Sequence, residues 1–216
     1  MRAHYYKIKH IPVTTPPNPG AILNFEVGFM WEAQVTNWLR SAGIPFIEQY
    51  SMHDTELNLS GTLDFAPFDP KTGVWEVWDS KTEGMMANTY RKRQKKSFFE
   101  AHPEYAMQLC CYAIMLDRQN FTVGKGRFAV IVKDNGLVYE DLVGFTPDLR
   151  KKTLDRLARL NLHLETNTVP DCECEDWKVG YCDYGNPATT KENSTKKMVN
   201  TECCPTIDVL EQWANA

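Results

Sequence analysis

The sequence contains no long apolar run. Its apolar stretches are far shorter than the ~20 residues that a helix needs to span a membrane. The first residues also do not join positive charge to an apolar segment, as a signal peptide does. Both absences argue against an integral membrane protein and against a secreted one. We therefore expect a soluble, intracellular protein that resides in the cytoplasm and has no membrane partner.

An excess of positive charge is also missing. The 216 residues include 24 Lys and Arg against 28 Asp and Glu, which gives a net charge of −4. This excludes an electrostatic footprint for nucleic acid over the whole surface, so a site for a polyanion has to be local. Hydrophobic residues make up 43% of the chain, which is enough for a packed core and excludes a disordered chain. We expect one domain with a small appendage.

Cysteine is present in an odd number, seven, which does not suit a fully paired disulfide framework. Cys110 and Cys111 lie within an apolar helical pattern, and a reducing compartment fits the distribution better than disulfides do. The other five crowd near the C-terminal end and are Cys172, Cys174, Cys182, Cys203 and Cys204. Thiolates from this group could hold Zn²⁺ or a 4Fe-4S cluster, although the C-x-C-x7-C spacing matches neither common pattern. Reduced thiols without a metal are the alternative.

Proline and composition divide the chain into three parts. Residues 1–20 contain several prolines, so we expect an extended N-terminal segment there. Residues 21–169 carry the periodic patterns of a folded core. Residues 170–216 form a Cys-containing C-terminal extension that is too poor in apolar residues to build a core of its own.

Within the core, spacings of three and four predict helices and alternation predicts strands. The expected helices cover residues 24–43, about 103–116 and 147–165, and the expected strands cover residues 57–65, 74–81, 127–132 and 137–143. In the first strand, Leu63 and Phe65 are expected on one apolar face. Short turns join the first two strands into a hairpin and the last two strands through Asp134-Asn135-Gly136. This order predicts an α/β domain with a mixed sheet flanked by helices.

Two carboxylates and an ammonium group are expected to converge at the hairpin. Asp79 and Lys81 are two residues apart on one strand and share a face, and Asp64 lies on the neighbouring strand. Carboxylate oxygens are the ligands that Mg²⁺ prefers, and a lysine can orient a water or offset charge on a phosphoryl transition state. Glu32 interrupts the apolar face of the first helix, where an unpaired acid is costly, and could reach the same point.

A simpler interpretation is available for this pair. An Asp and a Lys two apart on a half-exposed strand most often form a solvated ion pair of little energetic value. Asp64 and Glu32, which fall in the same predicted neighbourhood, favour a functional site over this alternative.

These residues resemble a known family. Gly61-Thr62-Leu63-Asp64, followed by Trp78-Asp79-Ser80-Lys81, resembles the PD-(D/E)XK phosphodiesterase signature. Gln108 and Tyr112 resemble the Q-x-x-x-Y motif of its RecB-like exonuclease branch, and Glu32, four residues after Gly28, matches the acidic position on that branch's first helix. The resemblance covers about residues 25–115 in the family's order. It implies a restriction-endonuclease-like fold.

The resemblance also implies roles. A Mg²⁺ or Mn²⁺ ion would be held by Asp64, Asp79 and the backbone carbonyl of Ser80, with Glu32 acting directly or through water. Lys81 would serve the attacking water. Gln108 and Tyr112, one helical turn apart, would project toward the active site or the nucleic acid. Leu63 stands where the family usually has a proline.

A basic run follows the predicted site. It consists of Arg91, Lys92, Arg93, Lys95 and Lys96. Such runs are usually solvated faces, but this one is the concentrated positive patch of an acidic chain and would suit phosphate contacts to DNA. Several RecB-like nucleases also carry an iron–sulfur cluster that includes a cysteine before the first helix. No cysteine precedes Cys110 here, so Cys203 or Cys204 would have to supply that ligand.

The sequence thus predicts a metal-dependent DNA exonuclease acting on single strands or duplex ends, in recombination, repair or phage DNA metabolism. If it is phage-encoded, it would work in the host cytoplasm. The G-x-x-x-x-G-K-[S/T] loop of helicases is missing, so it would act alone or with a helicase or recombination protein. Whether copies form a homo-oligomer stays open. The alternatives are a structure-selective or site-specific endonuclease on the same fold, or a non-catalytic nucleic-acid binding or assembly protein.

Overall fold

The structure is a computed structural model that describes residues 2–11, 13 and 19–171. The chain divides into two compact units. One consists of Leu23–Asp155, and the other combines Met1–Ile22 with the chain from Arg156 onward. The Cys-containing extension expected from residue 170 lies almost entirely outside the described residues, and with it lie its five cysteines.

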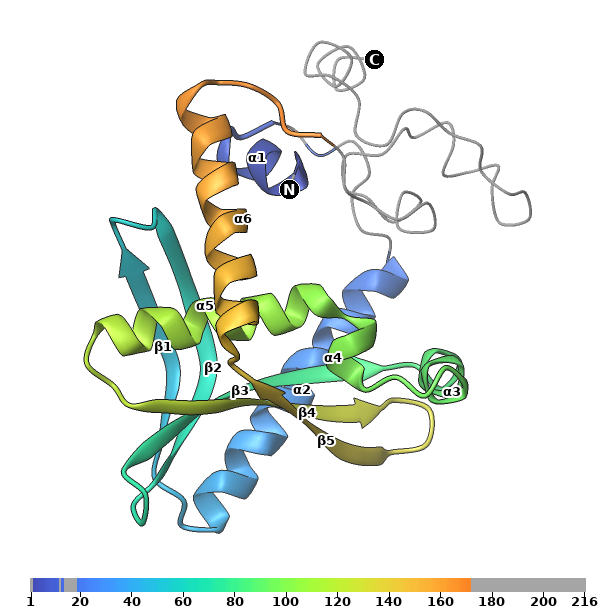
Figure 1. The fold of residues 1–216 in the computed structure, drawn as a ribbon. Helices are drawn as coiled ribbons and strands as arrows, with labels where there is room; N and C mark the ends of the chain where they lie inside the picture. Colours follow the sequence, from blue (N-terminus) through green and yellow to red (C-terminus); the bar gives the residue numbers. More distant parts are fainter. Residues whose placement is uncertain (1, 12, 14–18, 172–216) are drawn as a thin grey trace. The chain divides into compact units, whose positions relative to one another are not determined.

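A five-stranded sheet organises the unit Leu23–Asp155 (Figure 1). Its strands, in spatial as well as chain order, are β1 (Phe46–Asp54), β2 (Leu59–Asp69), β3 (Val74–Glu83), β4 (Val123–Val132) and β5 (Leu137–Gly144). β3 and β4 run parallel, and every other neighbouring pair is antiparallel. The predicted mixed sheet, with its two hairpins, is confirmed, and the architecture agrees with a restriction-endonuclease-like fold.

Helices precede, interrupt and follow the strands. They are α1 (Arg2–Ile8), α2 (Pro19–Ser41), α3 (Met85–Arg93), α4 (Phe98–Ala101), α5 (Pro103–Arg118) and α6 (Pro147–Glu165). The bounds of α6 coincide with the predicted ones. None of the helices in the described part of the chain is long and apolar enough to cross a membrane.

The sheet has an apolar layer on each face. On one face, α2 packs Trp31, Val35 and Leu39 against the strands, and the indole nitrogen of Trp31 donates to the carbonyl of Ala129 at 3.0 Å. On the other face, α5 buries Leu109, Ala113 and Leu116 together with residues of α4 and the sheet. The 3.6-residue period of these apolar positions explains why both segments are helical. The same packing places Glu32 on α2 and Tyr112 on α5 against the strands between them.

The structure corrects the expected extended N-terminal segment. Residues Arg2–Ile8 are helical, because the prolines that disfavour a helix begin only at Pro12. In its own unit, α1 buries Tyr5 and Tyr6 completely, and the Tyr5 hydroxyl donates to the side-chain oxygen of Asn167 at 3.4 Å.

Candidate active site

The site forms where β2 and β3 separate. Their pairing runs from Asp69 opposite Val74 to Phe65 opposite Trp78. At the next position, the side chain of Asp64 accepts a hydrogen bond from the backbone N–H of Ser80 at 3.2 Å. A side-chain contact thus joins the two strands beyond the last of their paired positions.

The alternation of β2 also breaks at Asp64. Leu63 lies in the apolar layer beneath α5, whereas Phe65 lies in the layer beneath α2. The expectation that Leu63 and Phe65 share a face is therefore wrong, because strict alternation does not hold across Asp64. The break lets Asp64 occupy the gap between the strands.

Gln49 on β1 lies opposite this break and was missed by the sequence analysis. The pairs Glu48 with Phe65 and Tyr50 with Leu63 place it across from Asp64. Its φ of 48° is in the left-handed region, which is uncommon for a residue other than glycine. Its side-chain amide donates to the carboxylate of Glu32. The one sequence signal is the polar pair Glu48-Gln49, which interrupts the apolar residues of β1.

Asp79 is the most deeply buried carboxylate of the site. Its residue is 3% exposed, and its Oδ2 atom forms an ion pair with the Lys81 ammonium group. Burial, and after it the neighbouring Asp64 carboxylate, raises the pKa of Asp79 to about 7, although the Lys81 charge acts in the opposite direction.

Lys81 stays a cation in this environment. Burial alone would lower its pKa, but the Asp79 carboxylate outweighs burial, and the pKa of Lys81 is raised. Its side chain is 20% exposed, and the ammonium nitrogen lies 4.9 Å from the ring centroid of Tyr105 on α5. A protonated lysine here can donate hydrogen bonds and balance negative charge, but it cannot accept a proton.

Glu32 reaches the same region from α2, as expected. Burial raises its pKa, and the negative charge of Asp64 raises it further, whereas Lys81 acts in the opposite direction. The structure therefore brings Glu32, Asp64, Asp79 and Lys81 within electrostatic range of one another.

Gln108 and Tyr112 close the site on the α5 side. The Gln108 amide donates to the Tyr112 hydroxyl at 3.1 Å. Burial raises the pKa of Tyr112, and the carboxylates of Asp79 and Asp64 add to the shift. Gly61 makes room for this ring, because a Cβ atom at position 61 would lie 2.8 Å from Tyr112 Cε1.

The donor set suits a hard cation with few protein ligands. Among the described residues, no three His, Cys, Asp or Glu side chains form a ready metal cage. Two carboxylates, Asp64 and Asp79, do meet, and the Asp79 carboxylate is buried. Mg²⁺ is commonly held by one or two carboxylates while it keeps several waters, so these residues fit it. The Glu32 carboxylate accepts a hydrogen bond from Gln49, which suits a contact with a bound ion through a water.

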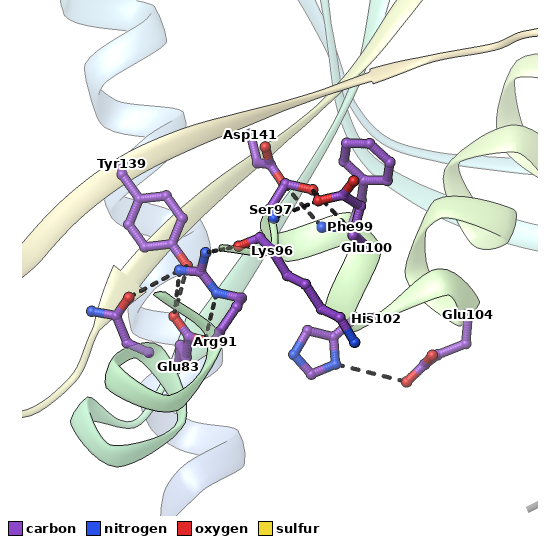
Figure 2. A network of polar contacts seen from close by, with 11 residues as sticks. Glu83, Arg91, Lys96, Ser97, Phe99, Glu100, His102, Glu104, Tyr139 and Asp141 are labelled. Atoms are coloured by element: carbon purple, nitrogen blue, oxygen red, sulfur yellow. Dashed lines mark hydrogen bonds and ion pairs between the residues drawn. The ribbon is translucent and has the colours of Figure 1, made fainter. Parts of the chain in front are cut away.

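The basic run divides into one buried and four exposed residues. Arg91 is 7% exposed, and its guanidinium group forms an ion pair with Glu83 at 3.0 Å (Figure 2). Arg91 is therefore removed from the set expected to contact nucleic acid, because its charge is neutralised inside the protein. The exposed members are Lys92, Arg93, Lys95 and Lys96.

The two described cysteines belong to α5. Cys110 and Cys111 are free thiols, and burial raises the pKa of both, that of Cys111 to about 12. A raised pKa keeps them as unreactive thiols at neutral pH.

Comparisons with known proteins support the fold and go no further. No family model matches the sequence, and no curated protein matches it. A solved protein named SSO0001 is similar, with a TM-score of 0.52 and 16% identity over 91% of this chain and 82% of its own. A second, from Eubacterium rectale and named "Putative exonuclease", has a TM-score of 0.43 and 11% identity over 92% of this chain and 74% of its own. That second likeness is too slight to carry an argument about activity.

Proposed function

We propose that this chain is a metal-dependent deoxyribonuclease that hydrolyses phosphodiester bonds. The observation that carries the proposal is the buried Asp79 carboxylate, which has a raised pKa and lies beside a second carboxylate, Asp64, and a buried lysine. A purely structural ion pair of Asp79 with Lys81 would not need the second carboxylate, whose negative charge disfavours the ionised form of Asp79.

The residues of the site have separable tasks in this proposal. Asp64, Asp79 and the Ser80 carbonyl would hold Mg²⁺ or Mn²⁺, which supplies a Lewis acid and an activated water when bound. The Lys81 ammonium group balances negative charge that develops on the phosphate. Glu32, oriented by Gln49, accepts a hydrogen bond from a water on the α2 side. Tyr112 and Gln108 bound the space available to the substrate on the α5 side.

We further propose an exonuclease that acts on DNA single strands or duplex ends, with recombination, repair or phage DNA metabolism as its setting. The support is the family resemblance of Glu32, Asp64, Asp79-Ser80-Lys81 and the Gln108–Tyr112 pair.

The test is degradation of end-labelled DNA, single- and double-stranded, linear and circular, with Mg²⁺, with Mn²⁺ and with EDTA. Wild type is compared with Lys81→Ala and Asp79→Ala, and with Lys71→Ala as a control in the exposed turn between β2 and β3. We expect cleavage of linear DNA that disappears in EDTA and in the two site variants but persists in the control. Cleavage of circles would show an endonuclease instead. Folded wild type that cleaves no substrate would overturn the enzymatic proposal in favour of a binding protein.

A further inference from the structure

Helix α3 buries polar side chains and exposes apolar ones, the reverse of the usual arrangement. The two residues that it buries, Asn88 and Arg91, are polar. Its large apolar side chains face solvent instead, with Met85 49%, Met86 87% and Tyr90 66% exposed. Helices on the surface of a protein normally bury the apolar residues and expose the polar ones. Hydrophobic burial therefore does not hold α3, and its apolar face is left available.

Polar contacts of Arg91 hold α3 in place, and we call this group of contacts the Arg91 clamp (Figure 2). Arg91 donates to both carboxylate oxygens of Glu83 at 3.0 and 3.1 Å and to the Asn88 side chain at 2.9 Å. It also donates to the Tyr139 hydroxyl at 2.7 Å and to the Lys96 carbonyl at 3.0 Å.

The clamp fixes α3 relative to the candidate active site. Glu83 follows Lys81 by two residues on β3, so the helix is anchored about 7 Å along the strand from that lysine. The first turn is held as well, because Asp134 accepts from the backbone N–H of Met85 at 2.6 Å. A helix held at both ends presents its outer face in one orientation.

The outer face of α3 combines an aromatic ring with positive charge. Met86, Tyr90 and Arg93 are spaced i, i+4 and i+7, so they form one stripe on the side opposite the buried Asn88 and Arg91. The exposed cations Lys92, Lys95 and Lys96 lie in or directly after the same helix. This cluster stands out in a chain whose net charge is −4.

We propose that this stripe binds single-stranded nucleic acid, with a base stacked on Tyr90 and phosphates contacted by Arg93, Lys92 and Lys95. The proposal rests on the proposed function, because it identifies the substrate as a single strand led toward Lys81. Exposed aromatic rings interleaved with cations are typical of single-strand binding, where unpaired bases offer free faces for stacking. The positive charge favours this occupant over an apolar protein partner, which would need the methionine and tyrosine but not the cations.

The test is binding of a fluorescein-labelled oligothymidylate of about 12 nucleotides, followed by fluorescence anisotropy. All proteins carry Lys81→Ala so that the probe stays intact. We expect Tyr90→Ala to weaken binding by about 5- to 150-fold, the range found when one stacked base is lost, and Tyr90→Phe to stay within about twofold of the parent. Lys95→Ala should reduce the slope of log K against log salt by about 0.7, whereas Tyr90→Ala should not change it.

Phe29→Ala is the matched control, because Phe29 is 64% exposed on α2. Equal losses in Phe29→Ala and Tyr90→Ala would overturn the assignment to α3. Unchanged binding by Tyr90→Ala would overturn it too, as would an equal loss on a duplex of the same length. A change of oligomeric state by sedimentation in Met86→Ala and Tyr90→Ala, without a binding defect, would assign the stripe to a protein interface. Binding is measured on the Lys81→Ala background and cleavage on the wild type. Tyr90-dependent binding together with a wild type that cleaves nothing would therefore refute the nuclease and leave single-strand binding by the stripe standing.

Discussion

Two buried charge clusters lie a few residues apart on β3, and they are built in opposite ways. The pair Glu83 and Arg91 is fully hydrogen-bonded, and the Tyr139 hydroxyl donates to Glu83 at 2.7 Å as it accepts from Arg91. The pair Asp79 and Lys81 is buried beside a second carboxylate, Asp64, and burial raises the pKa of Asp79 to about 7 although Lys81 acts against this shift.

The difference shows where the fold uses charge for structure and where it keeps charge for chemistry. A buried ion pair with every group satisfied fixes the position of a segment, and here it fixes α3. A buried carboxylate whose pKa is raised by burial and by a second carboxylate is a candidate for binding something else. The two clusters should therefore respond in opposite directions to removal of one partner.

The largest expected effect is in the Arg91 clamp. Arg91→Ala leaves the Glu83 carboxylate buried without its partner, so we expect the free energy of unfolding to fall by about 3–5 kcal/mol. Urea denaturation measures it. The neighbouring exposed charge provides the control, since Lys92→Ala should change stability by no more than about 0.5 kcal/mol. Similar small losses in both variants would mean that the clamp does not hold α3.

The second-largest effect on stability is expected where Gly61 packs against the Tyr112 ring, which forms a wall of the candidate active site. Gly61→Ala places a Cβ atom against the Tyr112 ring, 2.8 Å from Cε1, and should cost about 1–3 kcal/mol of stability. Gly28→Ala is the matched control, because a Cβ atom there meets nothing within 4 Å and alanine favours the helix. Equal stability of the two variants by urea denaturation would show that Tyr112 yields, and that the wall is less rigid than the structure indicates.

Two substitutions of Gln49 separate the effect of its backbone conformation from the effect of its side chain. Gln49→Val forces a β-branched residue into a φ of 48° and should cost about 1–2 kcal/mol. Gln49→Gly relieves that backbone and should keep stability within about 0.5 kcal/mol, yet it removes the amide that orients Glu32 and should slow DNA cleavage about tenfold. Stability and initial cleavage rates are measured on the same preparations. Wild-type cleavage by Gln49→Gly would remove Gln49 from the site.

Substitution of Asp79 is expected to change the free energy of unfolding in the opposite direction, toward greater stability. The folded protein holds the Asp79 proton up to about pH 7, whereas the unfolded chain releases it near the ordinary pKa of 3.8. Between these values the folded state binds more protons, so this group makes the metal-free protein less stable as the pH rises. Asp79→Asn should remove that fall, so its free energy of unfolding should match or exceed that of wild type at about pH 8. A loss of several kcal/mol would place Asp79 with the clamp.

The sequence predicted the parts of the fold that depend on regular periodicity. The alternation of β3 and the 3.6-residue pattern of α5 and α6 indicated elements that the structure contains. Asp79 and Lys81 were expected together because they are two residues apart on one strand. Asp64 was added because the hairpin brings it alongside, and Glu32 because it interrupts the apolar face of a helix. These predictions depend on local spacing, which the sequence displays directly.

The missed features depend on contacts between distant residues. β1 was not predicted, because its polar pair and the left-handed Gln49 obscure the alternation. α3 was missed because its apolar and polar faces are reversed. Arg91 was assigned to the surface because the partners that neutralise it, Glu83 and Tyr139, come from other elements.

The most direct test of the account is divalent cation binding, measured by titration calorimetry with Mn²⁺ on metal-free protein. Mn²⁺ prefers oxygen ligands, so cysteine thiols should not compete. We predict that wild type binds Mn²⁺, that Asp79→Asn weakens the binding by at least about tenfold, and that Tyr139→Phe, in the Arg91 clamp, binds as wild type does. Equal affinity of wild type and Asp79→Asn would contradict the claim that the Asp79 carboxylate on β3 is a metal ligand.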